Sequence, residues 1–293
     1  MAFAVRATLL PPAFLDAVVA IGHNENVNGT STWVTEASGF FYGYLVQDDP
    51  DPAKRLYEVY LVTSQHVIGN HSDIFVRMNP KKTSDQGEVF DAPITDAGVP
   101  QWFTHPNRSV DVAATRINWK LLQDRGISVS FIPNDISAAD TKKMGDIGVS
   151  AGDGVFVVGF PMNLAGQQRN YAIVRPGAIA RVTDLIESAT TTLMIDSHIF
   201  PGNSGGPVFL EPSLMSIEGT KSNQKAYLIG MVKDYIPYTD VAVSVQTQRP
   251  RITFEENSGL ADVIPVDRIN ETISAWRSSQ TQTLQAPLKA PTQ

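Results

Sequence analysis

Residues 201–208, with the sequence Pro-Gly-Asn-Ser-Gly-Gly-Pro-Val, constrain the fold of this chain more than any other stretch. Three glycines and two prolines within eight positions indicate a tight turn, and the apolar residues that follow predict the start of a strand. Glycines beside Ser204 would let a carbonyl group approach the backbone N–H groups closely. A serine hydroxyl is a weak nucleophile, which needs a general base and donors that hold an oxyanion. The motif alone also fits a plain glycine-rich turn, so partners for Ser204 decide its meaning.

The positions of the histidines exclude one class of serine hydrolase. The pattern Gly202-x-Ser204-x-Gly206 matches the nucleophile elbow of α/β-hydrolases, in which the histidine follows the serine. All the histidines of this chain precede Ser204; they are His23, His66, His71, His105 and His198. The order His, Asp, Ser remains, because chains of that order also form such sites.

One histidine and one aspartate stand in suitable surroundings. His66 comes at the end of an apolar run that begins near Val59, which predicts a buried strand that presents an imidazole where it ends. Asp111 lies inside the otherwise apolar segment 109–117. A buried carboxylate is costly unless it is paired, and a histidine N–H is a suitable partner. The three residues lie far apart in the sequence, so only the tertiary fold can bring them together.

Here the chain resembles the trypsin-like serine peptidases, and among them the cysteine-free bacterial type that includes the HtrA proteases. The segments that carry the resemblance are 63–67 (TSQHV), 111–113 (DVA) and 202–207 (GNSGGP). Supporting segments occur in the family's order between about residues 17 and 276; they are 39–43, 158–161, 229–232 and 263–267.

The resemblance implies a role for each matching residue. It implies that His66 is the general base, that Asp111 orients it and that Ser204 is the nucleophile. It further implies an oxyanion hole formed by Gly202, Asn203 and Ser204.

Many short apolar segments separated by turns predict an all-β protein. The resemblance makes this specific: two six-stranded antiparallel β-barrels, the active site in the cleft between them, and a C-terminal helix. We expect a first barrel over 1–132, which carries His66 and Asp111, and a second over 133–277, which carries Ser204 and the terminal helix.

The C-terminal segment divides into a helix and a tail. The spacing of Val266, Ile269, Ile273 and Trp276 predicts one apolar helix face that packs on the core. Residues 278–293 are rich in Gln, Thr, Ser and Pro, which predicts a disordered tail. We expect no additional PDZ module of the kind that the HtrA proteases carry within these 293 residues.

The strand expected over 227–232 leads into the substrate cleft. We expect Val232, Lys233 and Asp234, continued by Tyr235, to line the cleft where a peptide substrate adds as an extra strand. The resemblance brings His198 near the wall of the specificity pocket, where it would bind substrate. Residues 236–259 are expected to form a long polar insertion at the rim of the cleft.

Composition bounds the partners and the compartment. A net charge of −7 argues against a nucleic-acid partner, and no apolar run reaches membrane-spanning length, so we expect no membrane partner. Gly152-Asp153-Gly154 precedes an apolar strand rather than a helix, and no ligand cluster accompanies His66 and His71, so we expect no cofactor and no metal. The absence of cysteine and of a signal-peptide pattern at the N-terminus leads us to expect a cytoplasmic protein.

These observations predict a serine endopeptidase that works through a Ser-His-Asp triad and an acyl-enzyme on a polypeptide substrate. The alternative is a non-catalytic or latent peptide-binding module on a protease fold, and an esterase would use the same residues. Secreted trypsin-like zymogens usually carry Asp at the position of Asn203, where it pairs with a newly formed N-terminus. Asn203 cannot form that ion pair, so activation by a protein partner is a hypothesis.

Overall fold

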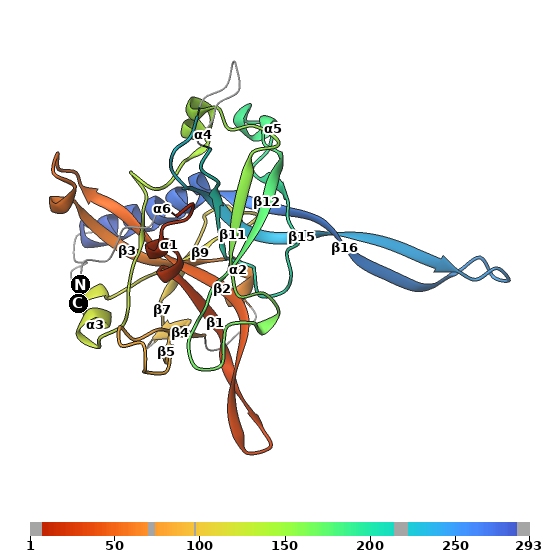
Figure 1. Ribbon diagram of the computed structural model, residues 1–293, viewed down its shortest axis with the longest axis horizontal. Helices are drawn as coiled ribbons and strands as arrows, with labels where there is room; N and C mark the ends of the chain where they lie inside the picture. Colours follow the sequence, from red (N-terminus) through yellow and green to blue (C-terminus); the bar gives the residue numbers. More distant parts are fainter. Residues whose placement is uncertain (1–7, 70–73, 97, 214–221, 286–293) are drawn as a thin grey trace, which may run out of the picture.

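A computed structural model describes residues 8–69, 74–96, 98–213 and 222–285, and its strands form two main sheets (Figure 1). The first sheet has eight strands in the order β5-β4-β1-β2-β3-β9-β8, and β10 pairs with β2. Their bounds are β1 (Val18–Val27), β2 (Thr30–Gln47), β3 (Leu56–Thr63), β4 (Phe75–Met78), β5 (Glu88–Asp91), β8 (Trp102–Thr104), β9 (Ala113–Arg116) and β10 (Ile132–Pro133). A separate two-stranded sheet pairs β6 (Thr95–Asp96) with β7 (Val99–Pro100).

The second main sheet is a closed barrel in the order β11-β12-β13-β16-β15-β14. Its strands are β11 (Gly154–Gly159), β12 (Ile173–Arg181), β13 (Leu193–Asp196), β14 (Pro207–Leu210), β15 (Tyr227–Val243) and β16 (Pro250–Pro265). The helices are α1 (Pro12–Asp16), α2 (Gln65–Gly69), α3 (Trp119–Asp124), α4 (Thr141–Ile147), α5 (Thr183–Ile186) and α6 (Val266–Gln285), with 3-10 turns η1 (Pro52–Lys54) and η2 (Pro161–Asn163). None of the helices within the described residues combines the length and the apolar character that crossing a membrane requires.

The prediction of a mostly β protein with a six-stranded barrel and a C-terminal helix is confirmed. The first sheet differs from the first barrel expected over 1–132, because it has eight strands and stays open in the part of the chain that the structure describes. Its edges are β5 and β8, and the chain between them pairs locally as β6 and β7 instead of bridging the gap. The domain boundary between residues 132 and 133 stays a prediction.

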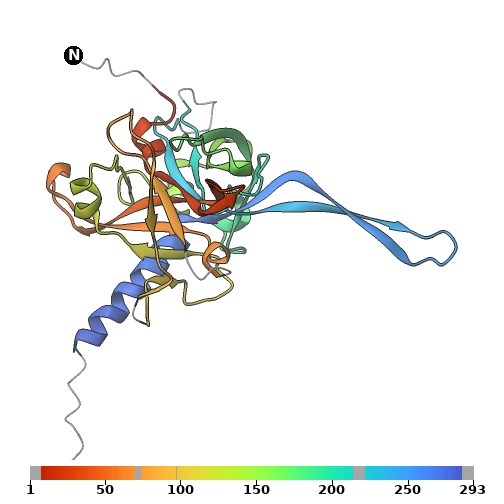
Figure 2. The same ribbon diagram turned by 90° about the horizontal axis from the view of Figure 1, so that it is seen from below.

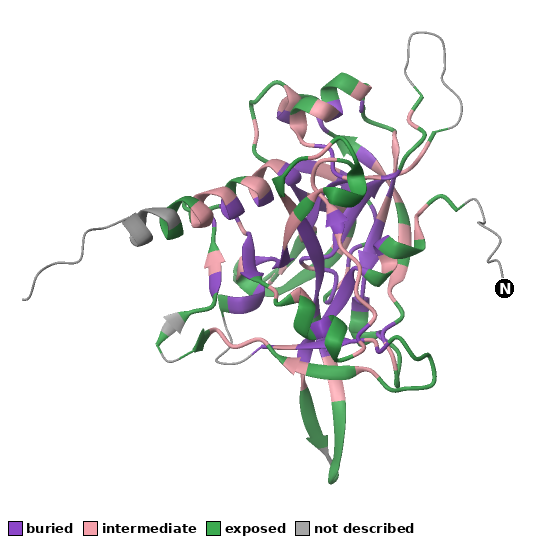
Figure 3. Cartoon of the chain, turned by 90° about the vertical axis from the view of Figure 1, so that its left-hand side faces the viewer, coloured by how far each residue is buried: buried purple, intermediate pink, exposed green. Residues whose placement is uncertain are grey.

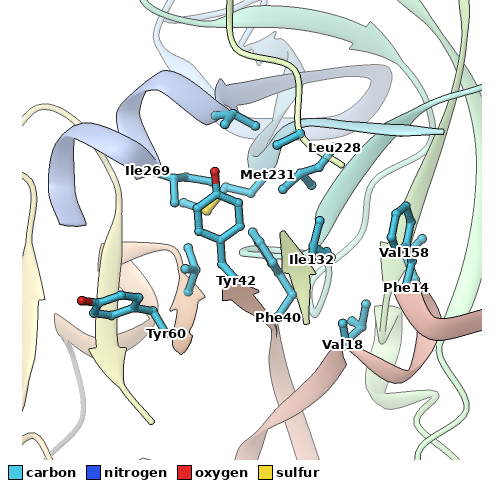
Figure 4. Close-up of a cluster of buried hydrophobic side chains, with 14 of the residues drawn as sticks. Phe14, Val18, Phe40, Tyr42, Tyr60, Ile132, Val158, Leu228, Met231 and Ile269 are labelled. Carbon is cyan, nitrogen blue, oxygen red and sulfur yellow. The ribbon is translucent and has the colours of Figure 1, made fainter. Parts of the chain in front are cut away.

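Of the three buried apolar clusters within the described residues, one lies between the two sheets and contains residues of both. Phe14 of α1 stacks on Phe209 of β14, with ring centroids 5.0 Å apart, and so joins the start of the chain to the barrel. Figure 4 shows Phe40 and Tyr42 of β2 on the same core as Val158, Leu228 and Met231 of the barrel; all are fully buried. Burial of these large apolar side chains stabilises the contact between the sheets and fixes the elements that border it.

Helix α6 packs on this core with the predicted face. Val266, Ile269 and Ile273 are buried, and Trp276 stacks on Phe103 of β8 with ring centroids 4.6 Å apart. The helix continues to Gln285, so the disordered tail expected from residue 278 is corrected: Ser278 still lies in the helix, where its hydroxyl donates to the Ser274 carbonyl. Residues 286–293 lie outside the described residues.

Two hairpins extend beyond the body of the molecule in Figure 1, and Figure 2 shows the one formed by β15 and β16 from below. One joins β1 to β2, and Figure 3 shows that its end is exposed while the strands behind it are buried. The other joins β15 to β16 and occupies most of the expected insertion 236–259. That insertion is therefore a strand pair rather than an irregular rim.

Candidate active site

Asp111 holds His66 by two hydrogen bonds. Strand β3 ends at Thr63, and the short helix α2 then carries His66, so the histidine lies on a helical turn just beyond the end of the predicted strand. The backbone N–H of His66 donates to Asp111 Oδ1 over 2.8 Å, and His66 Nδ1 lies 2.7 Å from Asp111 Oδ2. With its proton on Nδ1, the neutral ring presents Nε2 as a base. The predicted pairing of these two residues is present in the structure.

The surroundings of His66 favour its charged form. The hydrogen bond that the His66 ring donates to Asp111 raises the pKa of His66, burial lowers this pKa, and the negative charges of Asp111 and Asp234 raise it again. Lys233 opposes these charges. The net effect is a raised pKa, so the ring keeps its proton to a higher pH than a free imidazole does.

Ser204 follows a turn that the sequence specifies closely. The backbone N–H of Asn203 donates to the Phe200 carbonyl over 3.0 Å, which closes a four-residue turn with Pro201 and Gly202 at its centre. Gly202 has φ +101°, a conformation that favours glycine, and this Pro-Gly pair is typical of a type II turn. The Met162 N–H donates to the Pro201 carbonyl over 2.7 Å and fixes the central peptide from outside.

Ser38 of β2 connects the first sheet to this turn through hydrogen bonds. The Ser38 N–H donates to the Ser204 carbonyl over 3.0 Å, and its hydroxyl donates to the Gly202 carbonyl over 2.6 Å. The Phe160 N–H donates in turn to the Ser38 hydroxyl over 2.9 Å. Ser38 is fully buried, and the sequence analysis missed it because a serine before an apolar strand carries no distinctive pattern.

Two backbone donors beside Ser204 are available to a ligand. Within the described residues, the N–H groups of Gly202 and Ser204 donate to no protein acceptor. The N–H of Asn203 is already used by Phe200, so the expectation that Asn203 adds to an oxyanion hole is corrected. The Asn203 side chain is buried, and its oxygen has no hydrogen-bond partner there.

His66 and Ser204 line one cleft of about 330 Å³. Within the described residues, no hydrogen bond joins the His66 ring to the Ser204 hydroxyl, and such contacts often tighten only when substrate binds. The other lining residues are Glu36, Ala37, Val67, Ile199, Phe200, Pro201, Gly202, Asp234 and Tyr235. A larger pocket of about 680 Å³ lies beside β3 and α3 and contains none of the candidate site residues.

The expected substrate-binding residues separate into two groups. Asp234 and Tyr235 line the cleft as expected. Lys233 and His198 are not among the lining residues, and Val232 is fully buried with its carbonyl accepting from Gly205 N–H. Sequence reasoning missed Glu36, Ala37 and Val67, which border the cleft only because of the way β2 and α2 are placed in the fold.

The chain is similar to known proteins over most of its length. The family model described as the trypsin-like peptidase domain matches residues 37–212, which is more than half of the chain. Among solved structures, the chain is similar to the apo form of the MamO protease domain from Magnetospirillum magneticum, with 16% identity and a TM-score of 0.44. That similarity covers 88% of this chain and 95% of the other. None of the curated proteins compared with the chain matches it.

Proposed function

The chain belongs to the trypsin-like peptidase family, and from that premise we propose that it is a serine endopeptidase. The observation that carries the proposal is the pair of hydrogen bonds that His66 donates to the Asp111 carboxylate at 2.8 and 2.7 Å, in a cleft that Ser204 also lines. A carboxylate that accepts from both the backbone N–H and the Nδ1–H of a histidine fixes the orientation of the ring. Nε2 is then available for proton transfer. The two unused N–H groups beside Ser204 add the donors that acyl transfer needs.

In the proposed reaction His66 transfers the protons, Ser204 carries the acyl group, and backbone N–H groups bind the oxyanion. His66 Nε2 takes the proton of the Ser204 hydroxyl as Oγ attacks the carbonyl carbon of a peptide bond. The N–H groups of Gly202 and Ser204 receive the negative oxygen that forms, and each such donor contributes about 10²–10³ in kcat. His66 then gives its proton to the leaving amine, and an acyl-enzyme remains. Water, deprotonated by His66, hydrolyses that ester and releases Ser204.

Asp111 supports these steps by orienting His66 and by stabilising the imidazolium that forms after proton transfer. Glu36 and Asp234 give the cleft a negative lining, which would favour substrates with positive side chains near the cleaved bond. Ser38 would act as a positioning residue, because it holds the carbonyls of both Gly202 and Ser204.

A latent or non-catalytic peptide-binding module is the second candidate. The observation that favours it is the missing hydrogen bond between the His66 ring and the Ser204 hydroxyl within the described residues. In that case a protein partner would bring the two side chains into contact and switch on the site.

Turnover on two substrate classes tests the proposal. We expect the native chain to hydrolyse an internally quenched peptide, and Ser204→Ala and His66→Ala each to lower kcat by about 10⁴-fold or more. Hydrolysis of simple esters without peptide cleavage would indicate an esterase instead. A folded native chain that binds peptide and cleaves neither substrate would support the latent module.

A further inference from the structure

The β15–β16 hairpin forms an arm, defined here as residues 236–258, that projects from the barrel (Figures 1 and 2). Its strands pair antiparallel from Pro237 opposite Asn257 to Val243 opposite Pro250. Large apolar side chains are exposed along both strands; they are Tyr238, Val241, Val243, Ile252 and Phe254. A two-stranded hairpin without a third strand or a packed face is only marginally stable in water, so the arm is suited to holding a further chain.

One edge of this arm begins in the cleft. On the side of β15 away from β16, β14 pairs only with the segment from Tyr227 to Met231. The N–H of Val232 then donates to the Gly206 carbonyl over 2.9 Å. Beyond it, residues 233–243 pair with no strand on that side within the described residues. Asp234 and Tyr235 belong to this free edge and also line the cleft with His66 and Ser204.

Strand addition is already expected beside Val232, Lys233 and Asp234 in the cleft; we propose that it continues along the whole free edge of β15 to Val243, so that the arm binds the part of a polypeptide substrate that lies further before the cleaved bond, as a third antiparallel strand. This inference rests on the proposed function, which supplies cleavage at Ser204 and a polypeptide as the substrate. A substrate polypeptide is a better occupant than a second copy of the chain, because the free edge of β15 is continuous with the cleft. A peptide that extends from Ser204 along β15 reaches the arm directly. Exposed sheet edges bind extended peptides through backbone hydrogen bonds in this way.

The direction of the bound strand follows from the sheet. Both strands that pair with β15, β14 and β16, are antiparallel to it, and its parallel contact is an isolated bridge from Leu228 to Ala138 at its inner end. The strand β15 runs outward from Lys233 to Val243. An antiparallel peptide therefore has its C-terminal end at the cleft and its N-terminal end at the tip of the arm. At about 3.3 Å per residue, the edge spans roughly 35 Å, which corresponds to about ten substrate residues.

The side chains on β15 indicate the class of substrate. Tyr238, Val241 and Val243 offer apolar contacts, whereas Pro237 has no N–H and leaves one position of the ladder with only a carbonyl. A folded protein has its own strands already paired and cannot supply such a segment. The substrate is therefore an unfolded or extended polypeptide with β-branched or aromatic residues well before the cleaved bond.

The test measures binding rather than turnover, in the full chain with Ser204→Ala. Two fluorescent peptides share one C-terminal sequence; one has about four residues and the other about fourteen. Tyr238→Ser with Val241→Ser removes two of the three exposed apolar side chains of the arm on β15, whose exposed fractions are 59% and 40%. Ile252→Ser with Phe254→Ser is the matched control on β16, with exposed fractions of 57% and 50%.

We expect the long peptide to bind Ser204→Ala more tightly than the short one, and the β15 pair of substitutions to reduce that advantage about tenfold. The β16 pair should change it less than about threefold. Equal losses in both pairs, or no dependence on peptide length, would overturn the proposal. It would also be overturned if sedimentation showed a dimer that the β15 substitutions dissociate while peptide binding is unchanged, since the occupant would then be a second copy.

Labelling of the chain with intact Ser204 by a fluorophosphonate separates this inference from the proposed function. Length-dependent binding without any labelling would support the edge as a binding site and count against hydrolysis. Labelling without length-dependent binding would support the nucleophile and overturn the role of the arm.

Discussion

Substitution of Gly202 by alanine is predicted to remove activity by distorting a single turn. Gly202 has φ +101°, and an added Cβ would lie 2.3 Å from the Phe160 carbonyl oxygen and 3.2 Å from Pro161 Cα. Both neighbours are backbone atoms, so the turn itself must move. The conformation alone costs about 1–2 kcal/mol for a residue with a Cβ. Movement of the turn also displaces the Gly202 N–H, and the loss of one such donor lowers kcat by about 10²–10³.

Gly152→Ala is the matched control for this prediction. Gly152 has φ +96°, and an added Cβ there meets no atom within 4 Å, so only the conformational cost remains. Both variants should unfold a few degrees below the native chain, since about 1 kcal/mol corresponds to roughly 2–4 °C in a chain of this size class. In a kcat/KM assay on a peptide, only Gly202→Ala should lose about a hundredfold or more. A folded Gly202→Ala variant within about threefold of native activity would refute this reasoning.

Three further predictions concern proton transfer, specificity and stability. Because Asp111 raises the pKa of His66, the neutral base forms only at higher pH, and kcat/KM should fall as the pH drops through a value above the ordinary pKa of about 6.5; an acid limb below that value contradicts the account. Asp111→Asn should move this limb to lower pH and reduce kcat by about 10⁴. Glu36→Gln with Asp234→Asn should weaken any preference for lysine or arginine over neutral side chains in a peptide library, and an unchanged preference would exclude these carboxylates as its cause. Phe14→Ala should lower the free energy of unfolding by about 3–5 kcal/mol in a denaturant titration, because it empties the stacked contact with Phe209; a change below about 1 kcal/mol would mean that this contact does not join the sheets.

The sequence predicts the chemistry-bearing residues better than the cleft around them. His66 and Asp111 stand out because a histidine at the end of an apolar run and a carboxylate inside one both need a partner, and the structure pairs them. Ser38 and Glu36 carry no such signal. They reach the site only through the pairing of β2 with its neighbours, which periodicity in a single sequence does not reveal.

Strands with one buried face are predictable, and exposed hairpins are not. The apolar runs of β3 and β11 are recognised because burial selects their side chains. The segment 23–38 is polar and rich in Asn, Gly and Thr, which predicts a loop, and 236–259 is expected to be a polar insertion, yet both form paired strands. Their backbone hydrogen bonds hold them without a core, so their side chains need not alternate. The sequence likewise does not reveal that the first sheet stays open. The local pairing of β6 with β7 depends on backbone hydrogen bonds rather than on an apolar pattern.

The most direct test of the account is whether Ser204 is an activated nucleophile. A fluorophosphonate probe should label the native chain at one residue, which peptide mapping by mass spectrometry identifies as Ser204. Ser204→Ala should not be labelled, and His66→Ala should be labelled far more slowly, because the base that activates the hydroxyl is gone. A folded native chain that stays unlabelled, or that is labelled equally well in Ser204→Ala, would contradict the central claim.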